Sequence, residues 1–275
     1  TKRPQRTSCG LILIRMTSNY PKVLVGTVTY EGKDYIQKEH EQAIQDIKYP
    51  NTSRLVVDNS RGTSYVETLR RRGVNAVTVE RGSNSHEAIC NGYQRLWDHV
   101  LDNDFDYLLT VESDLLPQPD DLDRLMMHDR PIVGSWYYLG RKNQNAAYQP
   151  CIMVDTHDGA GKIGSKMLGA IHKDNGERVL DVGKVNEWKN SGLRECHGCG
   201  FGCTLIHRSI IEAIPKLDYV KTDEVEKHTD TWFYYQLRNN GISVFVDTDR
   251  VVEHHPSDWS EVEDRYSPEV AKKQD

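Results

Sequence analysis

The chain has 275 residues, of which 37% are hydrophobic and 28% are charged, and its formal net charge is −6. A chain of this length can bury one large core, so we expect a single domain over residues 1–275. The acidic balance disfavours a general nucleic-acid surface. No apolar run approaches the roughly 20 residues that a membrane-spanning helix needs.

Strands and helices alternate over the first half of the sequence. The expected strands are Lys22–Tyr30, Ser53–Ser60, Val74–Glu80 and Phe105–Val111. The expected helices between them are Lys33–Ile47, Ser64–Gly73 and Ser85–Asn103. This order predicts an α/β fold with βαβ units and a mostly parallel central sheet flanked by helices. Ligands of such folds bind beyond the carboxyl ends of the strands.

The second half is less regular. A turn and a helix start follow Pro117, and residues 139–196 form a polar segment with weak strands at Tyr148–Asp155 and Glu177–Trp188. We interpret this segment as an irregular excursion over the substrate face. Regular pattern resumes with a helix after Cys203, a helix at His228–Gly241 and a strand at Ile242–Thr248. We therefore expect a nucleotide-binding half at 22–138, an acceptor-binding half at 139–256 and a tail at 257–275.

Polar residues stand where the first three expected strands end. They are Thr27 and Thr29, then Asp58 and Ser60, then Ser83 and Asn84. Each alone is an ordinary turn residue, but together, on one sheet edge, they suit a pocket for a base and a ribose. The sequence has neither GxGxxG nor GxxxxGK[ST], which disfavours dinucleotide oxidoreductases and P-loop enzymes.

Two carboxylates follow the fourth strand, in Glu112-Ser113-Asp114. An extended segment would point Glu112 and Asp114 to the same side, with Ser113 between them as a spacer next to the donor. Such a pair beside a nucleotide pocket would hold Mn²⁺ or Mg²⁺ against a diphosphate. The last strand should return to this edge, so His254 is the candidate third ligand.

Asp230 opens the last predicted helix, in "HTDTWFYYQL". The simple interpretation is a helix N-cap. The functional one is a general base that takes a proton from an acceptor hydroxyl. Both can hold at once.

Three cysteines cluster in "CHGCGFGC", at Cys196, Cys199 and Cys203. A structural zinc site is one interpretation, but no second CxxC or HxxxH lies at ligand spacing. A glycine-rich loop with buried, reduced thiols is the preferred one, and it predicts a reducing, cytoplasmic compartment.

These features together resemble the GT-A glycosyltransferases, in particular the glycosyltransferase family 2-like branch of bacteria, archaea and their viruses. The resemblance covers about residues 22–256. It rests on "VLVGTVTYEGKDYI", "LVVDNSRG", "YLLTVESDLLPQPDDL", "GCGFGCTLIHRSII", "TDTWFYYQLRNNG" and "VFVDTDRVVEHH".

The resemblance implies roles for these motifs. The first two would line the nucleotide, which adds Tyr30 and Arg61 to the donor-binding set. The acid pair would be the DxD motif, with Glu in its first place, so Asp114 is the firmer ligand. The glycine-rich turn, with Gly200, Phe201 and Gly202, would border the sugar and the acceptor. Asp230 would be the catalytic base, although Thr229 replaces the family's usual Glu, which weakens the assignment of an inverting mechanism.

The sequence thus predicts a metal-dependent glycosyltransferase that uses a nucleotide sugar, with a UDP-sugar favoured over a GDP-sugar. Alternatives are a sugar-phosphate nucleotidyltransferase and a non-catalytic sugar-nucleotide-binding module. The expected acceptor is a hydroxyl group, most simply of a saccharide, and a modified DNA base remains open through a basic rim at Arg70–Arg72, Arg141 and Lys142. Trp136, Tyr137, Tyr138 and Trp188 are candidates to stack on an acceptor ring, and ordinary core or surface positions fit each of them at least as well.

Overall fold

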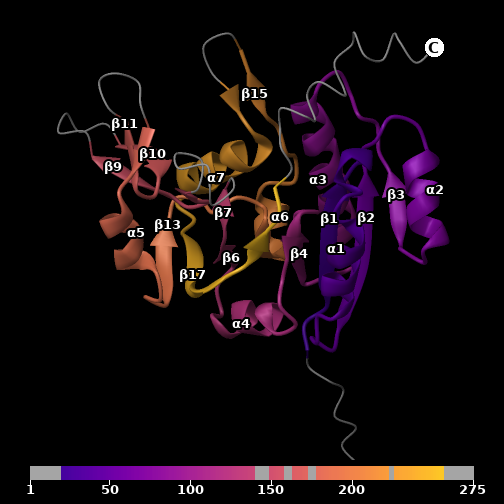
Figure 1. Cartoon of the computed structure of the whole chain (residues 1–275), viewed down its shortest axis with the longest axis horizontal. Coiled ribbons are helices and arrows are strands. Elements are labelled where there is room, and N and C mark those ends of the chain that lie inside the picture. The colour runs from indigo at the N-terminus through magenta and orange to yellow at the C-terminus, as the bar shows by residue number, and fades with distance from the viewer. Residues whose placement is uncertain (1–19, 140–148, 158–162, 173–177, 223–225, 257–275) are drawn as a thin grey trace, which may run out of the picture.

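The computed structural model describes residues 20–139, 149–157, 163–172, 178–222 and 226–256 (Figure 1). Eight strands form the central sheet: β1 Val23–Thr29, β2 Thr52–Asp58, β3 Ala76–Thr78, β4 Tyr107–Val111, β6 Ile132–Trp136, β13 Leu193–Cys196, β14 Cys203–His207 and β17 Val244–Val251. Their order is β13-β17-β6-β14-β4-β1-β2-β3. The pairs β1–β2, β1–β4, β2–β3 and β6–β17 are parallel, while β14 and β13 run against their neighbours. The predicted mostly parallel α/β sheet is therefore confirmed.

Seven α-helices lie within the described residues. They are α1 Gln37–Gln45, α2 Ser64–Arg71, α3 Ser85–Asp102, α4 Asp121–Met127, α5 Val182–Trp188, α6 Arg208–Ala213 and α7 Thr229–Asn239. A short 3-10 turn, Glu31–Lys33, precedes α1. Within the described part of the chain, no helix combines the length and apolar character needed to cross a membrane.

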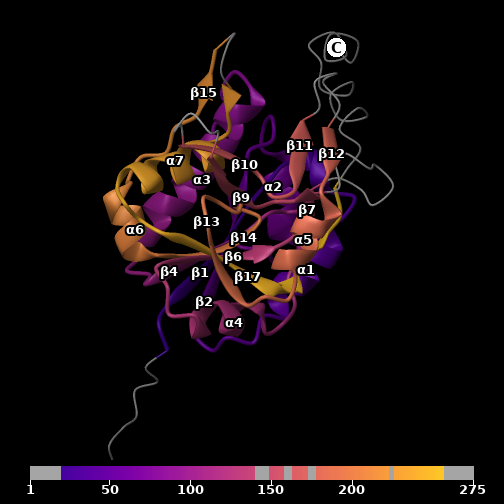
Figure 2. The ribbon, with the colours of Figure 1, turned by 90° about the vertical axis from the view of Figure 1, so that its left-hand side faces the viewer.

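The sheet buries both faces, as its continuous apolar strands predict. Alternate residues of one strand point to opposite faces, so Leu24 joins one core cluster while Val23 and Val25 join another. The first cluster includes residues of α3, α6 and α7, and the second includes residues of α1 and α4. Figure 2 shows α6 and α7 on one side of the strands and α1 on the other.

Over the described ranges, ten short strands lie outside this sheet. They are β5 Leu115–Leu116, β7 Tyr138–Leu139, β8 Gln149–Pro150, β9 Met153–His157, β10 Ile163–Met167, β11 Ala170–His172, β12 Arg178–Leu180, β15 Val220–Lys221, β16 Glu226–Lys227 and β18 Glu253–His254. They pair as β5–β18, β7–β8, β9–β10, β11–β12 and β15–β16. The described parts of the excursion after residue 139 thus consist mainly of short antiparallel strand pairs and α5, and β9, β10 and β11 stand beside α5 and β13 in Figure 1.

Two predicted elements are wrong. The segment after Cys203 is not helical from its start, because Cys203–His207 forms β14 between β4 and β6 and only Arg208–Ala213 is a helix. Its apolar run fits a central strand as well as a buried helix, and pairing on both sides decides between them. Glu177–Trp188 is also not one strand, since it divides into β12 and α5, with Asp181 as the N-cap of the helix.

Ion pairs tie α4 and its flanking residues to β17. Asp247 Oδ2 accepts from Arg124 Nη2 at 2.9 Å and lies 3.0 Å from His128 Nε2. Arg250 contacts Asp120 and lies 3.0 Å from Asp121 Oδ1. These contacts fix the direction in which the chain leaves β17, and therefore where β18 lies.

Candidate functional site

The acid pair lies in a turn directly after β4. The Leu115 N–H donates to the Glu112 carbonyl at 3.0 Å and closes the turn, and the Glu112 N–H donates to the Gly202 carbonyl at 2.8 Å. The extended geometry predicted for Glu112-Ser113-Asp114 is therefore wrong. Asp114 is 5% exposed and Ser113 4%, so this turn is packed into the protein.

His254 lies beside Asp114 because β18 pairs with β5. His254 is opposite Leu115 in that pair, and the His255 N–H donates to the Asp114 carbonyl at 2.8 Å. His254 Nε2 is 3.4 Å from Asp114 Oδ2. His254 Nδ1 lies 2.7 Å from the Tyr138 carbonyl, which can only accept, so Nδ1 carries a proton. Burial lowers the pKa of His254, but the hydrogen bond from Nε2–H to Asp114 and the charge of Asp114 outweigh it and raise that pKa above its ordinary value. When Nε2 loses its proton, Nδ1 keeps the hydrogen bond to Tyr138 and the Nε2 lone pair becomes available, the arrangement that a metal-binding imidazole needs.

Lys33 is a site residue that the sequence interpretation missed. Its Nζ lies 2.5 Å from Asp114 Oδ2, and both residues are buried. Lys33 ends the turn after β1, and β1 is the parallel neighbour of β4. A lysine close after the first strand could therefore have been placed next to the acid pair from the strand order alone.

The two carboxyl groups have opposite electrostatics. Burial and the nearby charge of Asp114 raise the pKa of Glu112 to about 7. Burial also acts on Asp114, but the hydrogen bond to His254 and the charge of Lys33 outweigh it and hold the pKa of Asp114 below its ordinary value. Asp114 is thus the carboxylate that stays ionised at neutral pH.

Asp230 lies in the first turn of α7, where its Oδ1 accepts from the Thr231 N–H at 2.6 Å. Burial raises the pKa of Asp230, and its charge contributes to the raised pKa of Glu112. Tyr93 of α3 is buried beneath this region, and after burial the charges of Glu112, Asp230 and Asp114 all raise the pKa of its hydroxyl. The fold therefore gathers three carboxyl groups from distant parts of the sequence into one electrostatic environment.

Asp114 and His254 together suit a divalent ion. Two octahedral ligands at right angles, each about 2.1 Å from an ion, lie about 3 Å apart, close to the 3.4 Å between Asp114 Oδ2 and His254 Nε2. Carboxylate oxygen with imidazole nitrogen is a donor set that Mn²⁺ accepts. Among the described residues, however, no three His, Cys, Asp or Glu side chains converge on a common metal position, so Glu112 does not join the pair in this conformation.

The predicted donor-binding residues of β1 and β2 lie at the carboxyl edge of the sheet. Thr27 Oγ1 lies 3.1 Å from His40 Nε2, and His40 Nδ1 lies 3.0 Å from the Leu115 carbonyl, so Thr27 supports the acid turn through His40. Asp58 Oδ1 accepts from the Ser60 N–H at 2.9 Å. Asp58 Oδ2 is buried and has no hydrogen-bond partner within the described residues, while the buried Thr29 Oγ1 lies beside the Tyr65 hydroxyl. Buried polar groups of native proteins are almost always paired, so Asp58 Oδ2 is able to accept a further hydrogen bond.

The other predicted donor-binding residues differ in their surroundings. Arg81 lies over the Tyr30 ring at 5.6 Å from its centroid, while Arg61 is exposed. Ser83 and Asn84 form the N-terminal cap of α3. Asn84 Oδ1 accepts from the Glu87 N–H at 3.0 Å, and the Ser83 N–H and Oγ both donate to Glu87 Oε2. The structure thus gives these two residues a helix-capping role.

The glycine-rich turn is packed against aromatic side chains. The Gly200 carbonyl accepts from Tyr234 Oη at 2.5 Å and from Thr204 Oγ1 at 3.0 Å. Phe201 is 1% exposed and lies 4.6 Å from the Tyr93 ring, centroid to centroid. A Cβ on Gly202 would come within 2.4 Å of the Tyr137 ring. The glycine-rich turn therefore packs against the turn that carries Glu112 and Asp114. Because the Phe201 side chain is buried, it cannot contact a bound sugar.

The predicted stacking of an acceptor on Trp136 is wrong in this conformation, because Trp136 has no exposed surface. Tyr137 is 1% exposed, and Trp188 is buried with Arg194 over its ring at 4.8 Å. Only Tyr138 keeps partial exposure. These aromatic residues form the core because β6 and α5 bury them.

The remaining predicted features have structural partners. Cys196, Cys199 and Cys203 are buried free thiols, and Cys199 Sγ lies 3.3 Å from Tyr234 Oη. In the predicted basic rim, Arg72 pairs with Asp34 at 3.4 Å, and Arg70 Nε donates to the Ala76 carbonyl. Arg141 and Lys142 lie outside the described residues.

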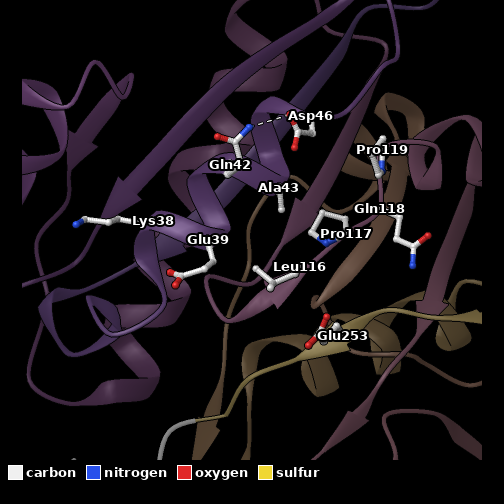
Figure 3. A pocket seen from close by; sticks show the side chains of 10 residues that line it. All are labelled: Lys38, Glu39, Gln42, Ala43, Asp46, Leu116, Pro117, Gln118, Pro119 and Glu253. Atoms are coloured by element: carbon white, nitrogen blue, oxygen red, sulfur yellow. Dashed lines mark hydrogen bonds between the residues drawn. The ribbon is translucent and has the colours of Figure 1, made fainter.

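Two hollows flank the site. One, of about 570 Å³, lies between α1 and the segment Leu116–Pro119, with Glu253 at its side (Figure 3). Leu116 and Glu253 alternate with Leu115 and His254, so this hollow lies on the opposite side of the β5–β18 pair from the Asp114 site. The second, of about 260 Å³, lies along α7 at Thr231, Tyr234, Tyr235 and Arg238, one residue from Asp230.

Comparison with solved structures shows which fold this is. The mannosyltransferase PcManGT from Pyrobaculum calidifontis, in complex with GDP-Man and Mn²⁺, matches with a TM-score of 0.52 and 15% identity over 87% of this chain and 59% of that chain. TarS of S. aureus, in complex with UDP-GlcNAc, matches with a TM-score of 0.49 and 12% identity over 87% of this chain and 60% of that chain. A CMP:2-keto-3-deoxy-manno-octonic acid synthetase with CTP matches with a TM-score of 0.48 and 10% identity over 92% of this chain and 96% of that chain.

The chain thus spans about three fifths of the length of the mannosyltransferase and TarS chains. No family model matches the sequence, and no curated protein matches it significantly. The likeness to PcManGT confirms the predicted GT-A fold.

Proposed function

We propose that this protein is a metal-dependent glycosyltransferase that moves a sugar from a nucleotide diphosphate to a hydroxyl acceptor. The observation that carries the proposal is the pairing of β18 with β5, which seats His254 3.4 Å from Asp114 at the carboxyl edge of the sheet. The PcManGT structure, which has the same fold, is a complex with GDP-Man and Mn²⁺, and this supports the choice of a nucleotide-sugar donor and a divalent ion.

Asp114 and His254 would hold Mn²⁺ or Mg²⁺. One or two protein ligands suffice for such an ion, because diphosphate oxygens and water complete its shell. When bound, the ion supplies Lewis-acid neutralisation of the charge that grows on the leaving diphosphate. Glu112, with a pKa near 7, would serve better as a hydrogen-bonding group for the donor sugar than as a ligand.

The donor nucleotide would lie beside β1 and β2. The buried acceptor oxygen Asp58 Oδ2 and the hydroxyl of Thr29 suit the N–H and O–H groups of a base and a ribose. Tyr30, Ser60 and Arg61 would border the same pocket. We expect a UDP-sugar in preference to a GDP-sugar, and a panel of activated sugars decides this.

Asp230 would act as the general base of an inverting reaction. Burial raises its pKa, which brings it closer to the pKa at which a base works best near neutral pH. The hollow of about 260 Å³ lies along an adjacent face of α7, at Thr231 and Tyr234, and we take it as the candidate entry for an acceptor hydroxyl. A saccharide is the expected acceptor, and a modified DNA base is the alternative.

The test is a panel of UDP-, GDP- and other activated sugars with Mn²⁺, scored for hydrolysis and, with acceptors, for the anomer formed. We expect one donor to be hydrolysed by the wild type and by Asp123→Asn, a control carboxylate of α4, and not by Asp114→Ala. Equal hydrolysis by Asp114→Ala would favour a different site. Binding of donors without any turnover would favour a non-catalytic module, and formation of a nucleotide sugar from a triphosphate would favour a nucleotidyltransferase.

A further inference from the structure

Lys33 is the cationic group that lies against the proposed metal ligand. Its Nζ is 2.5 Å from Asp114 Oδ2, the same oxygen that faces His254 Nε2 at 3.4 Å. The two side chains are only 11% and 8% exposed, so water screens their attraction weakly. Lys33 therefore already supplies positive charge at the carboxylate that a divalent ion would use.

The turn that carries Lys33 also borders the proposed donor pocket. The Lys33 N–H donates to the Tyr30 carbonyl at 2.9 Å, and the Glu31 N–H donates to Ser60 Oγ at 2.8 Å. These bonds tie one short segment to β1, to β2 and, through the ammonium, to Asp114. A ligand that enters beside Tyr30 and Ser60 thus acts on the same turn that holds Lys33.

We propose that Lys33 is an internal counterion that competes with the divalent ion for Asp114 and is transferred to the donor diphosphate when donor and ion bind together. This inference rests on the proposed function. An ammonium and a divalent cation repel each other at the separations available around one carboxylate, so the ion binds weakly while Lys33 holds Asp114. The diphosphate brings negative charge that can accept the ammonium, so donor and ion bind cooperatively.

The consequence is a lysine that opposes metal binding in the free protein. Replacing Lys33 with an uncharged residue leaves Asp114 and His254 in place and removes the competing charge. The variant Lys33→Met should therefore bind Mn²⁺ alone at least ten-fold more tightly than the wild type. Lys33→Arg, which keeps the charge, should not gain affinity, and Lys38→Met, which removes an exposed lysine of α1, should match the wild type.

The experiment is titration of the full chain with Mn²⁺ alone by isothermal calorimetry, with the Mn²⁺-dependent rise in melting temperature as a second readout. Lys33→Gln, which keeps a hydrogen-bond donor, serves if Lys33→Met folds poorly, and a variant that folds only when Mn²⁺ is present also supports the proposal. Equal Mn²⁺ affinity in wild type and Lys33→Met overturns the competition but leaves the metal site standing. Absence of Mn²⁺ binding in every variant overturns the competition together with the metal part of the proposed function.

Discussion

The Lys33–Asp114 pair makes a quantitative prediction about stability without metal. Removing one partner of a buried ion pair costs roughly 3–5 kcal/mol, because the other charge stays buried and unpaired. The two side chains are 11% and 8% exposed, so we take the lower end and expect about 3 kcal/mol for Asp114→Asn. Lys33→Met should cost less, about 2 kcal/mol, because His254 remains near Asp114 and can be protonated.

The double variant separates this interaction from other effects of each change. If the ion pair accounts for both single effects, the double variant Lys33→Met with Asp114→Asn should be about 2 kcal/mol less stable than the wild type. The sum of the two single changes is about 5 kcal/mol, so the coupling energy should be about 3 kcal/mol. For a chain of this size, the single Asp114→Asn change should lower the melting temperature by about 6–12 °C.

The assay is urea unfolding in EDTA, so that no ion contributes. The exposed pair Lys184–Glu187, at 2.8 Å with side chains 52% and 63% exposed, provides the matched control, and its coupling should stay within about 0.5 kcal/mol. Additivity of the Lys33 and Asp114 effects within about 0.5 kcal/mol would refute the reasoning, because independent sites behave in that way.

Three further predictions concern the surroundings of the site. Asp230→Asn should lower the rate of transfer by about 10²–10⁴-fold with unchanged Mn²⁺ affinity. Burial raises the pKa of Asp230, so on lowering the pH the kcat/KM of the wild type should begin to fall at a higher pH than an ordinary carboxylate would give. The same pH profile in the variant would contradict this role. Asp247 is paired with Arg124 of α4 and with His128 at the end of that helix, and its pKa is lowered in the folded protein. Asp247→Asn should therefore lower the free energy of unfolding by about 2 kcal/mol at pH 7. This difference in stability from the wild type should vanish as the pH falls through the lowered pKa. Unfolding from pH 7 to 3 measures it, and a constant difference would disprove it. Gly202→Ala would place a Cβ 2.4 Å from the Tyr137 ring and should cost about 1–3 kcal/mol, while Gly183→Ala in α5, whose Cβ would lie 3.2 Å from Asp181 Oδ1, should lower stability less. Thermal unfolding compares the two variants, and equal melting temperatures would exclude the clash.

Local pattern was sufficient for the strands that carry the site. The apolar runs before Asp58 and Glu112 predict β2 and β4, and their parallel order follows from the helices between them. Position on the sheet edge could therefore be inferred for both residues. The geometry of the acid turn could not be inferred from the sequence, because the Glu112 N–H donates to the carbonyl of Gly202, some 90 residues later in the chain.

Burial in the second half depended on contacts that the sequence does not display. The sequence left Trp136 either free to stack on an acceptor or buried in the core, and the position of β6 between β14 and β17 leaves it no exposed surface. The segment after Cys203 has the composition of a strand or of a buried helix. It forms a strand because it pairs with both β4 and β6. Tertiary pairing overrides local preference at both places.

The environment, more than the spacing, separates the roles of Glu112 and Asp114. Both are carboxylates in one turn, but Asp114 faces Lys33 and His254, and both lower its pKa. Burial raises the pKa of Glu112, and the charges of Asp114 and Asp230 raise it further. A pair whose pKa values are driven apart in this way can hold an ion with one member and exchange a hydrogen bond with a hydroxyl through the other. The positive charge of Lys33 thus explains why Asp114 is the member suited to a metal, and why the free protein should bind that metal less tightly than its ligands alone would allow.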